Sequence, residues 1–132
     1  MIKLNTPLQQ AHIGSLEVGQ MVNISGTVFT ARDRAHRYIL ENKEKFRTLL
    51  KGAVIYHCGP LVKNTENGWE ILAAGPTTSI RMEAYTADFI REFGIRAIIG
   101  KGGMGAATQK ALNDHGCVYL QAVGGAAVLL AS

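Results

Sequence analysis

The sequence predicts an α/β fold in which short apolar strands alternate with amphipathic helices. Two observations support this prediction. Runs rich in β-branched residues recur along the chain, and several are followed by a turn and then by apolar residues at helical spacing. A polar stretch ending in Asn-Gly also separates two apolar runs, which is typical of a β-hairpin. The pattern predicts a mixed-sheet domain, with at least two right-handed strand–helix–strand crossovers if the strands are parallel.

The first predicted unit is a strand over residues 22–30 followed by a basic turn and a helix. Alternate residues of the strand lie on one face, namely Val22, Ile24, Gly26 and Val28. After the turn ARDRAH, apolar residues lie on about one helical stripe as far as Leu50, and Gly52 closes the helix.

A second strand is predicted in GAVIYHCGPLV, residues 52–62, where Gly59-Pro60 interrupts it. The polar residues 63–68, KNTENG, then predict a hairpin turn into a further strand, WEILAAG. The following helix has apolar residues at helical spacing up to Gly94, its expected C-cap, and either Thr78 or Ser79 as its N-cap.

The last part of the chain repeats the order of strand, turn and helix. IRAIIG predicts an apolar strand, GKGGMG a turn, and residues 104–116 a helix that ends at Gly116. CVYLQAV predicts one more strand, and GGAAVLLAS predicts the beginning of a helix.

Composition narrows the class of protein. A length of 132 residues fits a single domain, 1–132, and 47% hydrophobic with 18% charged residues is not a signature of disorder. No apolar stretch is long enough to span a membrane, and the first residues do not resemble a secretory signal, so we expect a cytoplasmic protein. The net charge of +4 is not gathered into a Lys/Arg-rich run, which argues against nucleic-acid binding.

The cysteines and most histidines predict no metal site in this chain. Cys58 and Cys117 are too few for a disulfide framework, a structural zinc site or a complete iron–sulfur cluster, and we interpret them as buried apolar thiols. Three histidines have no evident carboxylate or metal-ligand partner in the sequence and are assigned to packing or the surface: His12, His57 and His115.

The glycine-rich turn IIGKGGMG contains the spacing G-x-G-x-x-G at Gly100, Gly102 and Gly105, the dinucleotide-binding fingerprint. That site also needs an acidic residue at the end of the next strand, and CVYLQAV ends without one. Nucleotide binding therefore stays a minor alternative. The free N–H groups expected at the helix start attract other anions, and the glycines, Gly102 among them, let a small anion approach Lys101.

Three turns carry a basic residue, namely Arg32, Arg81 and Lys101. If the strands are parallel, all three lie at the carboxyl ends of the sheet, where α/β folds bind ligands. Arginine offers a two-pronged donor to a carboxylate and lysine a point charge, so the set suits a small dicarboxylate.

Other residues near these turns complete the predicted site. Thr77 is four residues before Arg81 and shares a helical face with it if the helix opens early. Thr78 adds a second hydroxyl, and His36 lies one turn beyond Arg32.

The segments GTVFTARDRAHR, GAVIYHCGPLV, GPTTSIRM and IIGKGGMG, in this order and at this spacing, resemble the beta subunit of the iron–sulfur-dependent hydro-lyases, class I fumarase and L(+)-tartrate dehydratase. The resemblance runs from about Val18 to the end of the chain. It implies a swivelling β/β/α domain. Family members usually continue well past the GGAA segment, so either this sequence is a shortened one or the domain lacks its last strand and helix.

The resemblance further implies roles for individual residues. Arg32, Arg81 and Lys101 would bind the substrate carboxylates, and Thr77 would lie at the reacting carbon, where a family proposal makes it the proton-abstracting base. A separate alpha subunit would supply the cysteines that hold a four-iron cluster, whose unique iron would bind the substrate hydroxyl and act on it as a Lewis acid.

Two classes of function remain open at this point. One is a hydro-lyase beta subunit, in a hetero-oligomer or as a homodimer when isolated, that acts on fumarate and malate or on tartrate. The other is a non-catalytic dicarboxylate-binding module without a partner. The sequence does not choose between fumarate and tartrate, because both substrates present two carboxylates to the same residues.

Overall fold

The computed structural model describes residues 2–57, 61–65, 68–73 and 79–122, and it confirms the α/β class. Its centre is a four-stranded parallel sheet in the order β3-β4-β7-β8. The strands are β3 (Phe29–Thr30), β4 (Val54–Tyr56), β7 (Ala97–Gly100) and β8 (Val118–Gln121). The strands of this sheet pair in parallel, which was the condition for the predicted strand–helix–strand crossovers.

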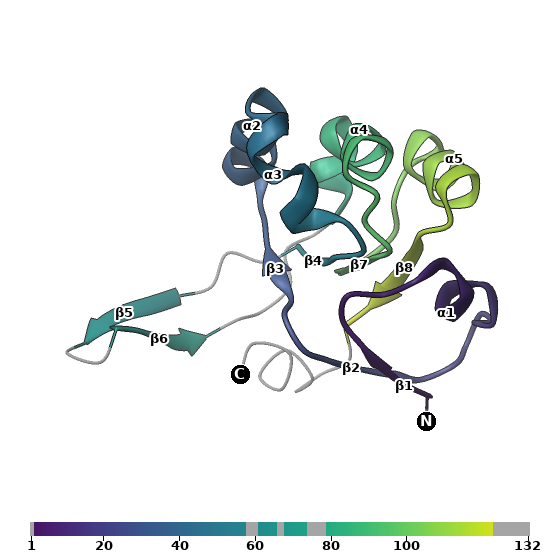
Figure 1. The fold of residues 1–132 in the computed structure, drawn as a ribbon, viewed down its shortest axis with the longest axis horizontal. Helices are drawn as coiled ribbons and strands as arrows, with labels where there is room; N and C mark the ends of the chain where they lie inside the picture. The colour runs from purple at the N-terminus through teal and green to yellow at the C-terminus, as the bar shows by residue number, and fades with distance from the viewer. Residues whose placement is uncertain (1, 58–60, 66–67, 74–78, 123–132) are drawn as a thin grey trace.

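Four helices cover one face of this sheet (Figure 1): α2 (Asp33–Glu41), α3 (Lys43–Leu50), α4 (Glu83–Phe93) and α5 (Ala106–His115). The core on this side contains Ile55 and Ile98 from the strands, packed with Phe89 of α4. Because side chains alternate along a strand, the residues on either side of Ile55 and Ile98 face the other way.

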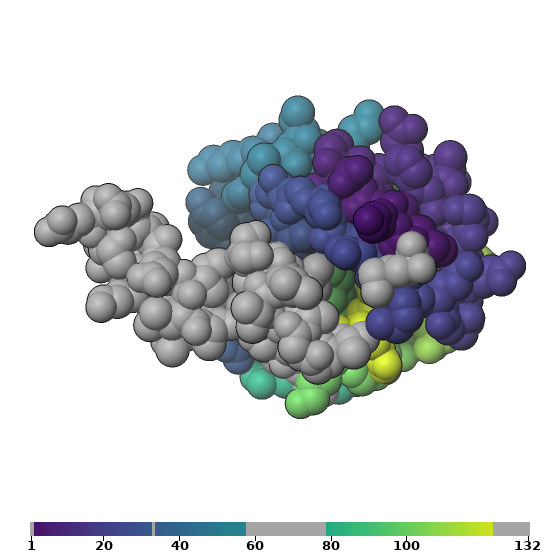
Figure 2. Space-filling model, turned by 90° about the horizontal axis from the view of Figure 1, so that it is seen from below, coloured from purple at the N-terminus to yellow at the C-terminus, as the bar shows by residue number. Residues whose placement is uncertain are grey.

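The opposite face of the sheet carries a second layer (Figure 1). Here β1 (Ile2–Asn5) pairs in parallel with β2 (Val22–Ser25), and α1 (Gln10–Gly14) lies between them in the sequence. Figure 2 shows this N-terminal segment, in purple and blue, on the side away from the helices. Leu4 and Ile24 pack there against Val54 and Tyr56, which makes a second apolar core.

The predicted hairpin is confirmed. Strands β5 (Leu61–Thr65) and β6 (Gly68–Ala73) pair antiparallel and extend to one side of the central sheet (Figure 1). The parallel and antiparallel strands that the sequence predicted are both present, and in the described residues they lie in separate sheets.

Two elements predicted as continuous are interrupted. Residues 22–30 form two strands in different sheets, because Gly26 between them has φ +106° and turns the chain. The stretch from the basic turn to Leu50 forms two helices, which meet at Asn42 with φ −131° and ψ 44°. Asn42 donates a hydrogen bond from its amide to the Tyr38 carbonyl and ends the first helix.

The ends of α4 and α5 agree with the prediction, but the start of α4 does not. Gly94 and Gly116 both adopt the left-handed conformation, each with φ +64°, and close their helices. A short 3-10 helix, η1 (Ser79–Met82), precedes α4, and the N-cap of α4 is Met82 rather than Ser79. The Ser79 hydroxyl is used in other contacts, described below.

Several predictions fall outside the described residues: the helix expected after residue 123, Cys58, Thr77 and Thr78. Within the described part of the chain, no helix is both long enough and apolar enough to cross a membrane.

Candidate functional site at the carboxyl edge of the sheet

The carboxyl ends of β3, β4 and β7 meet at one edge of the sheet, as parallel pairing requires. Arg32, His57 and Lys101 follow these three strands closely. Since neighbouring strands are about 4.8 Å apart, the ends of β3 and β7, which flank β4, lie about 10 Å apart. Long cationic side chains from these two ends can therefore reach a small ligand between them.

Arg32 occupies the N-cap position of α2 with an extended backbone, and its side chain is exposed. Its carbonyl accepts hydrogen bonds from two groups of His36, the backbone N–H at 2.9 Å and the ring Nδ1 at 2.8 Å. The neighbouring Ala31 N–H donates to the Tyr56 carbonyl at 3.0 Å. The Arg32 turn is thus held mainly by bonds within its own helix start.

Arg81 and Lys101 belong to two segments that are hydrogen-bonded to each other. The Ser79 N–H donates to the Lys101 carbonyl at 3.0 Å, and the Lys101 N–H donates to the Ser79 Oγ at 3.1 Å. Both cationic residues are exposed. The structure therefore joins η1, which carries Arg81, to the Lys101 turn. The strand before Arg81, β6, belongs to the antiparallel hairpin, so the hydrogen bonds to Lys101 place η1 there and strand order does not.

The Ser79 hydroxyl is the centre of a buried hydrogen-bond network. His57 Nδ1 lies 2.9 Å and the Tyr119 hydroxyl 3.1 Å from Ser79 Oγ, and Tyr119 also donates to the Gly102 carbonyl at 2.5 Å. A Cβ at Gly100 would lie 1.9 Å from Ser79 Oγ, so only glycine admits this serine. The network connects η1, β4, β8 and the glycine-rich turn.

His57 is fully buried, and its Nε2 has no hydrogen-bond partner among the described residues. Burial lowers the pKa of His57 to about 4, with a smaller contribution from His36, whose ring centroid lies 5.5 Å away. The ring is therefore neutral near pH 7. The sequence assigned His57 to packing or the surface; its burial decides for packing, and the sequence gave no sign of its bond to Ser79.

The N-terminus of α5 is occupied by a carboxylate of the chain itself. Glu83 Oε1 accepts hydrogen bonds from the Gly105 N–H at 2.8 Å and the Thr108 hydroxyl at 2.6 Å, and Oε2 accepts the Thr108 N–H at 3.3 Å. Burial raises the pKa of Glu83, but these hydrogen bonds outweigh burial and hold the pKa below its usual value.

This contact corrects the expectation that free N–H groups at the α5 start bind an external anion. The Gly105 and Thr108 N–H groups already bind Glu83, so the helix start no longer offers them to a ligand. In dinucleotide-binding folds the pyrophosphate lies at this position of the glycine-rich turn, and the Glu83 carboxylate lies there here, which argues against the nucleotide alternative. The exposed Lys101 side chain is the cation that this turn presents.

Two further predicted residues, His36 and Gly102, lie close to these turns, but neither presents a side chain at the edge of the sheet. His36 is only 1% exposed, and its ring packs against Phe89 at a centroid distance of 4.7 Å. It therefore lies beneath Arg32. Gly102 is exposed with φ +76°, and its carbonyl binds Tyr119. Thr77 and Thr78 lie outside the described residues.

Comparison with known proteins gives the family. All of the chain, residues 1–132, matches the family model described as Fumarase C-terminus. The chain belongs to this family. The fold described above is thus that of a fumarase C-terminus-type domain.

Relatives of this fumarase C-terminus-type domain include a protein of Geobacillus stearothermophilus provisionally named fumarate hydratase class I, 50% identical over 96% of this chain and 24% of its own length. The beta subunit of L(+)-tartrate dehydratase from Escherichia coli K12 is 36% identical over 98% of this chain and 64% of its own length. A Methanocaldococcus jannaschii protein, provisionally named as the same subunit, is 42% identical over 95% of this chain. The chain spans about a quarter of the first relative and somewhat less than two thirds of the second.

The described residues of this fumarase-type domain do not fit an iron–sulfur cluster. They contain no group of three or more His, Cys, Asp or Glu side chains that could hold a metal ion. Burial raises the pKa of the Cys117 thiol to about 12, and its Sγ lies 3.8 Å from the Val118 carbonyl. A thiol that stays protonated is a poor cluster ligand, because iron binds the thiolate.

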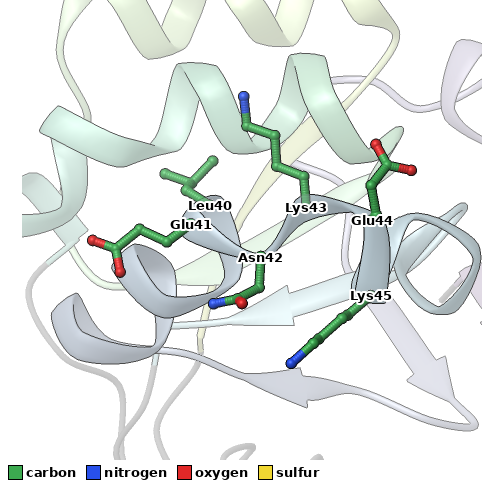
Figure 3. A pocket seen from close by; sticks show the side chains of 6 residues that line it. All are labelled: Leu40, Glu41, Asn42, Lys43, Glu44 and Lys45. Atoms are coloured by element: carbon green, nitrogen blue, oxygen red, sulfur yellow. The ribbon is translucent and has the colours of Figure 1, made fainter.

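A hollow of about 430 Å³ lies at the junction of α2 and α3, away from the cationic edge. Figure 3 shows its lining side chains, which point in different directions: Leu40, Glu41, Asn42, Lys43, Glu44 and Lys45. Because α2 begins at Arg32, this junction is at the other end of the helix. Its charges do not converge, so it is a weaker candidate than the carboxyl edge.

Proposed function

We propose that this chain is the carboxylate-binding half of a hydro-lyase that adds water to, or removes it from, a C4 dicarboxylate such as fumarate and malate or tartrate. The observation that carries the proposal is the hydrogen-bonded pairing of the Arg81 and Lys101 segments at the edge where Arg32 begins α2. The names of the relatives, fumarate hydratase and L(+)-tartrate dehydratase beta subunit, support the same reaction class.

In this proposal the three cations bind and orient the two carboxylates. Arg32 and Arg81 each offer two parallel N–H donors to a carboxylate, and Lys101 adds a compact charge. Removing a proton next to a carboxylate builds negative charge on that group in the transition state. Fixed cations stabilise this developing charge more than the starting carboxylate, which is the condition for acceleration.

The family resemblance assigns Thr77, which is proposed as the proton-abstracting group. Thr78, Gly102 and His36, which were suggested by their places near the basic turns, are proposed to line or support the site. A threonine hydroxyl acts as a base only where strong positive charge lowers its pKa, and Arg81 and Lys101 would supply that charge.

The proposal places a four-iron cluster on a partner alpha subunit, because the described residues of this chain do not fit one. Residues 1–132 would form one domain of a hetero-oligomer, or a homodimer when isolated, in the cytoplasm, where free thiols such as Cys117 persist. The beta-subunit names of two relatives support a two-part enzyme.

Anaerobic co-expression with a candidate alpha subunit tests the function. The purified complex is assayed for interconversion of fumarate and malate and for dehydration of tartrate. Turnover of one of these substrates, lost in Arg81→Ala and kept in Lys110→Ala, is the expected result. Lys110 is a suitable control because it is exposed on α5 and pairs with Asp114.

Binding without turnover would favour the alternative of a non-catalytic dicarboxylate-binding module. A rise in melting temperature with NAD or ATP, and none with malate or tartrate, would instead favour nucleotide binding and contradict the proposed site.

A further inference from the structure

The segment 79–83 and the segment 100–108 are hydrogen-bonded at both ends. At one end, Ser79 exchanges two bonds with Lys101, at 3.0 and 3.1 Å. At the other end, Glu83 accepts the bonds from Gly105 and Thr108. Arg81 lies between the two anchor residues in sequence, and Lys101 lies within the segment that they hold.

Both anchors require a glycine opposite them. A Cβ at Gly100 would lie 1.9 Å from Ser79 Oγ, and a Cβ at Gly105 would lie 2.6 Å from Glu83 Oε2. No real Cβ contact is this short, so any larger residue would displace the anchor. In a dinucleotide-binding site, the glycines of a G-x-G-x-x-G pattern leave room for a phosphate. In this chain, Gly100 and Gly105 leave room for the side chains of Ser79 and Glu83.

The two anchors differ in their surroundings. Ser79 is 0% exposed, and its hydroxyl also contacts His57 and Tyr119. Glu83 is half-buried, and both of its carboxylate oxygens accept hydrogen bonds from donors at the α5 start, among them the Thr108 hydroxyl, on a residue that is 0% exposed. Burial strengthens the Ser79 bonds, and the negative charge of the acceptor strengthens those of Glu83.

We propose that Ser79 and Glu83 are positioning residues that clamp the Lys101 turn against the Arg81 segment and thereby set the spacing of the two cations that bind substrate. The inference rests on the proposed function, in which Arg81 and Lys101 bind a dicarboxylate. A dicarboxylate has a fixed distance between its charged ends, so binding depends on this spacing. A displacement of about 1 Å at such a site costs up to about 100-fold in rate.

The test compares clamp variants with matched controls in the complex with the alpha subunit. Ser79→Ala removes the central hydroxyl, and its control is Thr86→Val, a buried hydroxyl that bonds only to the Met82 carbonyl of the preceding turn in the described residues. Glu83→Ala removes the whole carboxylate, whereas Glu83→Gln removes its charge and keeps one acceptor oxygen. The control for both is Asp88→Asn, which changes an exposed carboxylate of α4 that pairs with Arg91.

We expect kcat/KM to fall about 10- to 100-fold in Ser79→Ala and Glu83→Ala, with most of the change in KM. The inhibition constant of succinate, a dicarboxylate that lacks the hydroxyl, should rise by a similar factor. Glu83→Gln keeps one acceptor oxygen and should recover part of the loss. A purely structural role would lower the melting temperature and leave KM of the folded complex unchanged.

Unchanged KM and succinate inhibition in folded Ser79→Ala and Glu83→Gln complexes would overturn the proposal. If the wild-type complex neither binds nor converts a dicarboxylate, the proposed function fails instead. The clamp is then decided by hydrogen exchange of the 100–108 segment in the same preparations. Faster exchange in Glu83→Gln than in Asp88→Asn supports the clamp, and equal exchange contradicts it.

Discussion

The turn that carries Arg32 and the turn that carries Lys101 follow parallel strands at the same edge, but different contacts hold them. The Arg32 carbonyl is bound by His36, four residues along the chain. The Lys101 turn is bound by Ser79, which is 22 residues away in the sequence, and the carbonyl of its Gly102 is bound by Tyr119, 17 residues away. One turn is a local helix start, whereas the other exists only when distant segments have come together.

This difference has a consequence for how each turn responds to change. The Arg32 carbonyl is bound within its own helix, and the neighbouring Ala31 N–H bonds to the Tyr56 carbonyl of β4. The Lys101 turn can be disturbed from η1, β4 or β8, because the Ser79 hydroxyl joins all three elements to it.

Removing the cationic side chains should lower activity more than any other change, and it should do so equally at the Arg32 turn and at the Lys101 turn. Arg32→Ala and Lys101→Ala are each expected to lower kcat/KM by about 100- to 1,000-fold in the complex with the alpha subunit, because each removes a charge that stabilises the transition state. Steady-state kinetics on fumarate, malate and tartrate measure the loss, with Lys110→Ala as control. Activity within twofold of wild type in Lys101→Ala would contradict the site.

His57 connects the two turns, since its ring lies beside His36 of α2 and is bonded to Ser79, and its protonation should weaken this connection. Its folded pKa of about 4 is below the unfolded value of 6.5, so the folded state favours the neutral ring. Stability from this group is complete above pH 6.5 and is lost as pH falls toward 4, by about 3 kcal/mol. Urea denaturation between pH 7 and pH 4 measures this loss.

His57→Asn should remove most of this slope, whereas His115→Asn, at an exposed position, should keep it. Part of the decline at the lowest pH should persist in His57→Asn, because the lowered pKa of Glu83 also makes stability fall as this carboxylate is protonated. An identical slope in wild type and His57→Asn would show that His57 does not titrate as its burial implies.

Crowding the Ser79 hydroxyl should destabilise the Lys101 turn alone. Gly100→Ala places a Cβ 1.9 Å from Ser79 Oγ, and we expect a loss of about 1–3 kcal/mol in the free energy of unfolding. Gly103→Ala is a matched control in the same turn, since its Cβ would have nothing within 4 Å and its φ is not positive. Equal stabilities of the two variants in urea would mean that the close approach at Gly100 does not matter.

Removing the Tyr119 hydroxyl should have the smallest effect. Tyr119→Phe loses the bond to the Gly102 carbonyl and the contact with Ser79, and we expect a loss of about 1 kcal/mol. Tyr38→Phe, at a position 52% exposed, should leave the unfolding free energy unchanged. If Tyr119→Phe also matches wild type, the Lys101 turn is held from η1 alone.

The local periodicity of the sequence was enough to predict the α/β class, the hairpin and the glycines that end α4 and α5. These features depend on residues that are close along the chain, such as the alternation in a strand or a left-handed glycine after a helix. The Arg32 turn is of this kind, and its place at the carboxyl edge followed from strand order once the strands were parallel.

Tertiary packing decided what the glycine-rich turn binds. The sequence predicted free N–H groups at the α5 start, but Glu83 occupies them, and Ser79, predicted as an N-cap, instead holds the Lys101 turn. No periodicity links Glu83 to Gly105 or Ser79 to Tyr119, because their contacts arise only when η1, α5 and β8 pack together. Strand order in the sequence placed Arg32 and Lys101 after parallel strands, because each lies next to its strand in the chain. Long-range hydrogen bonds, which no local pattern encodes, decided how the Lys101 turn is held and brought η1 with Arg81 beside it.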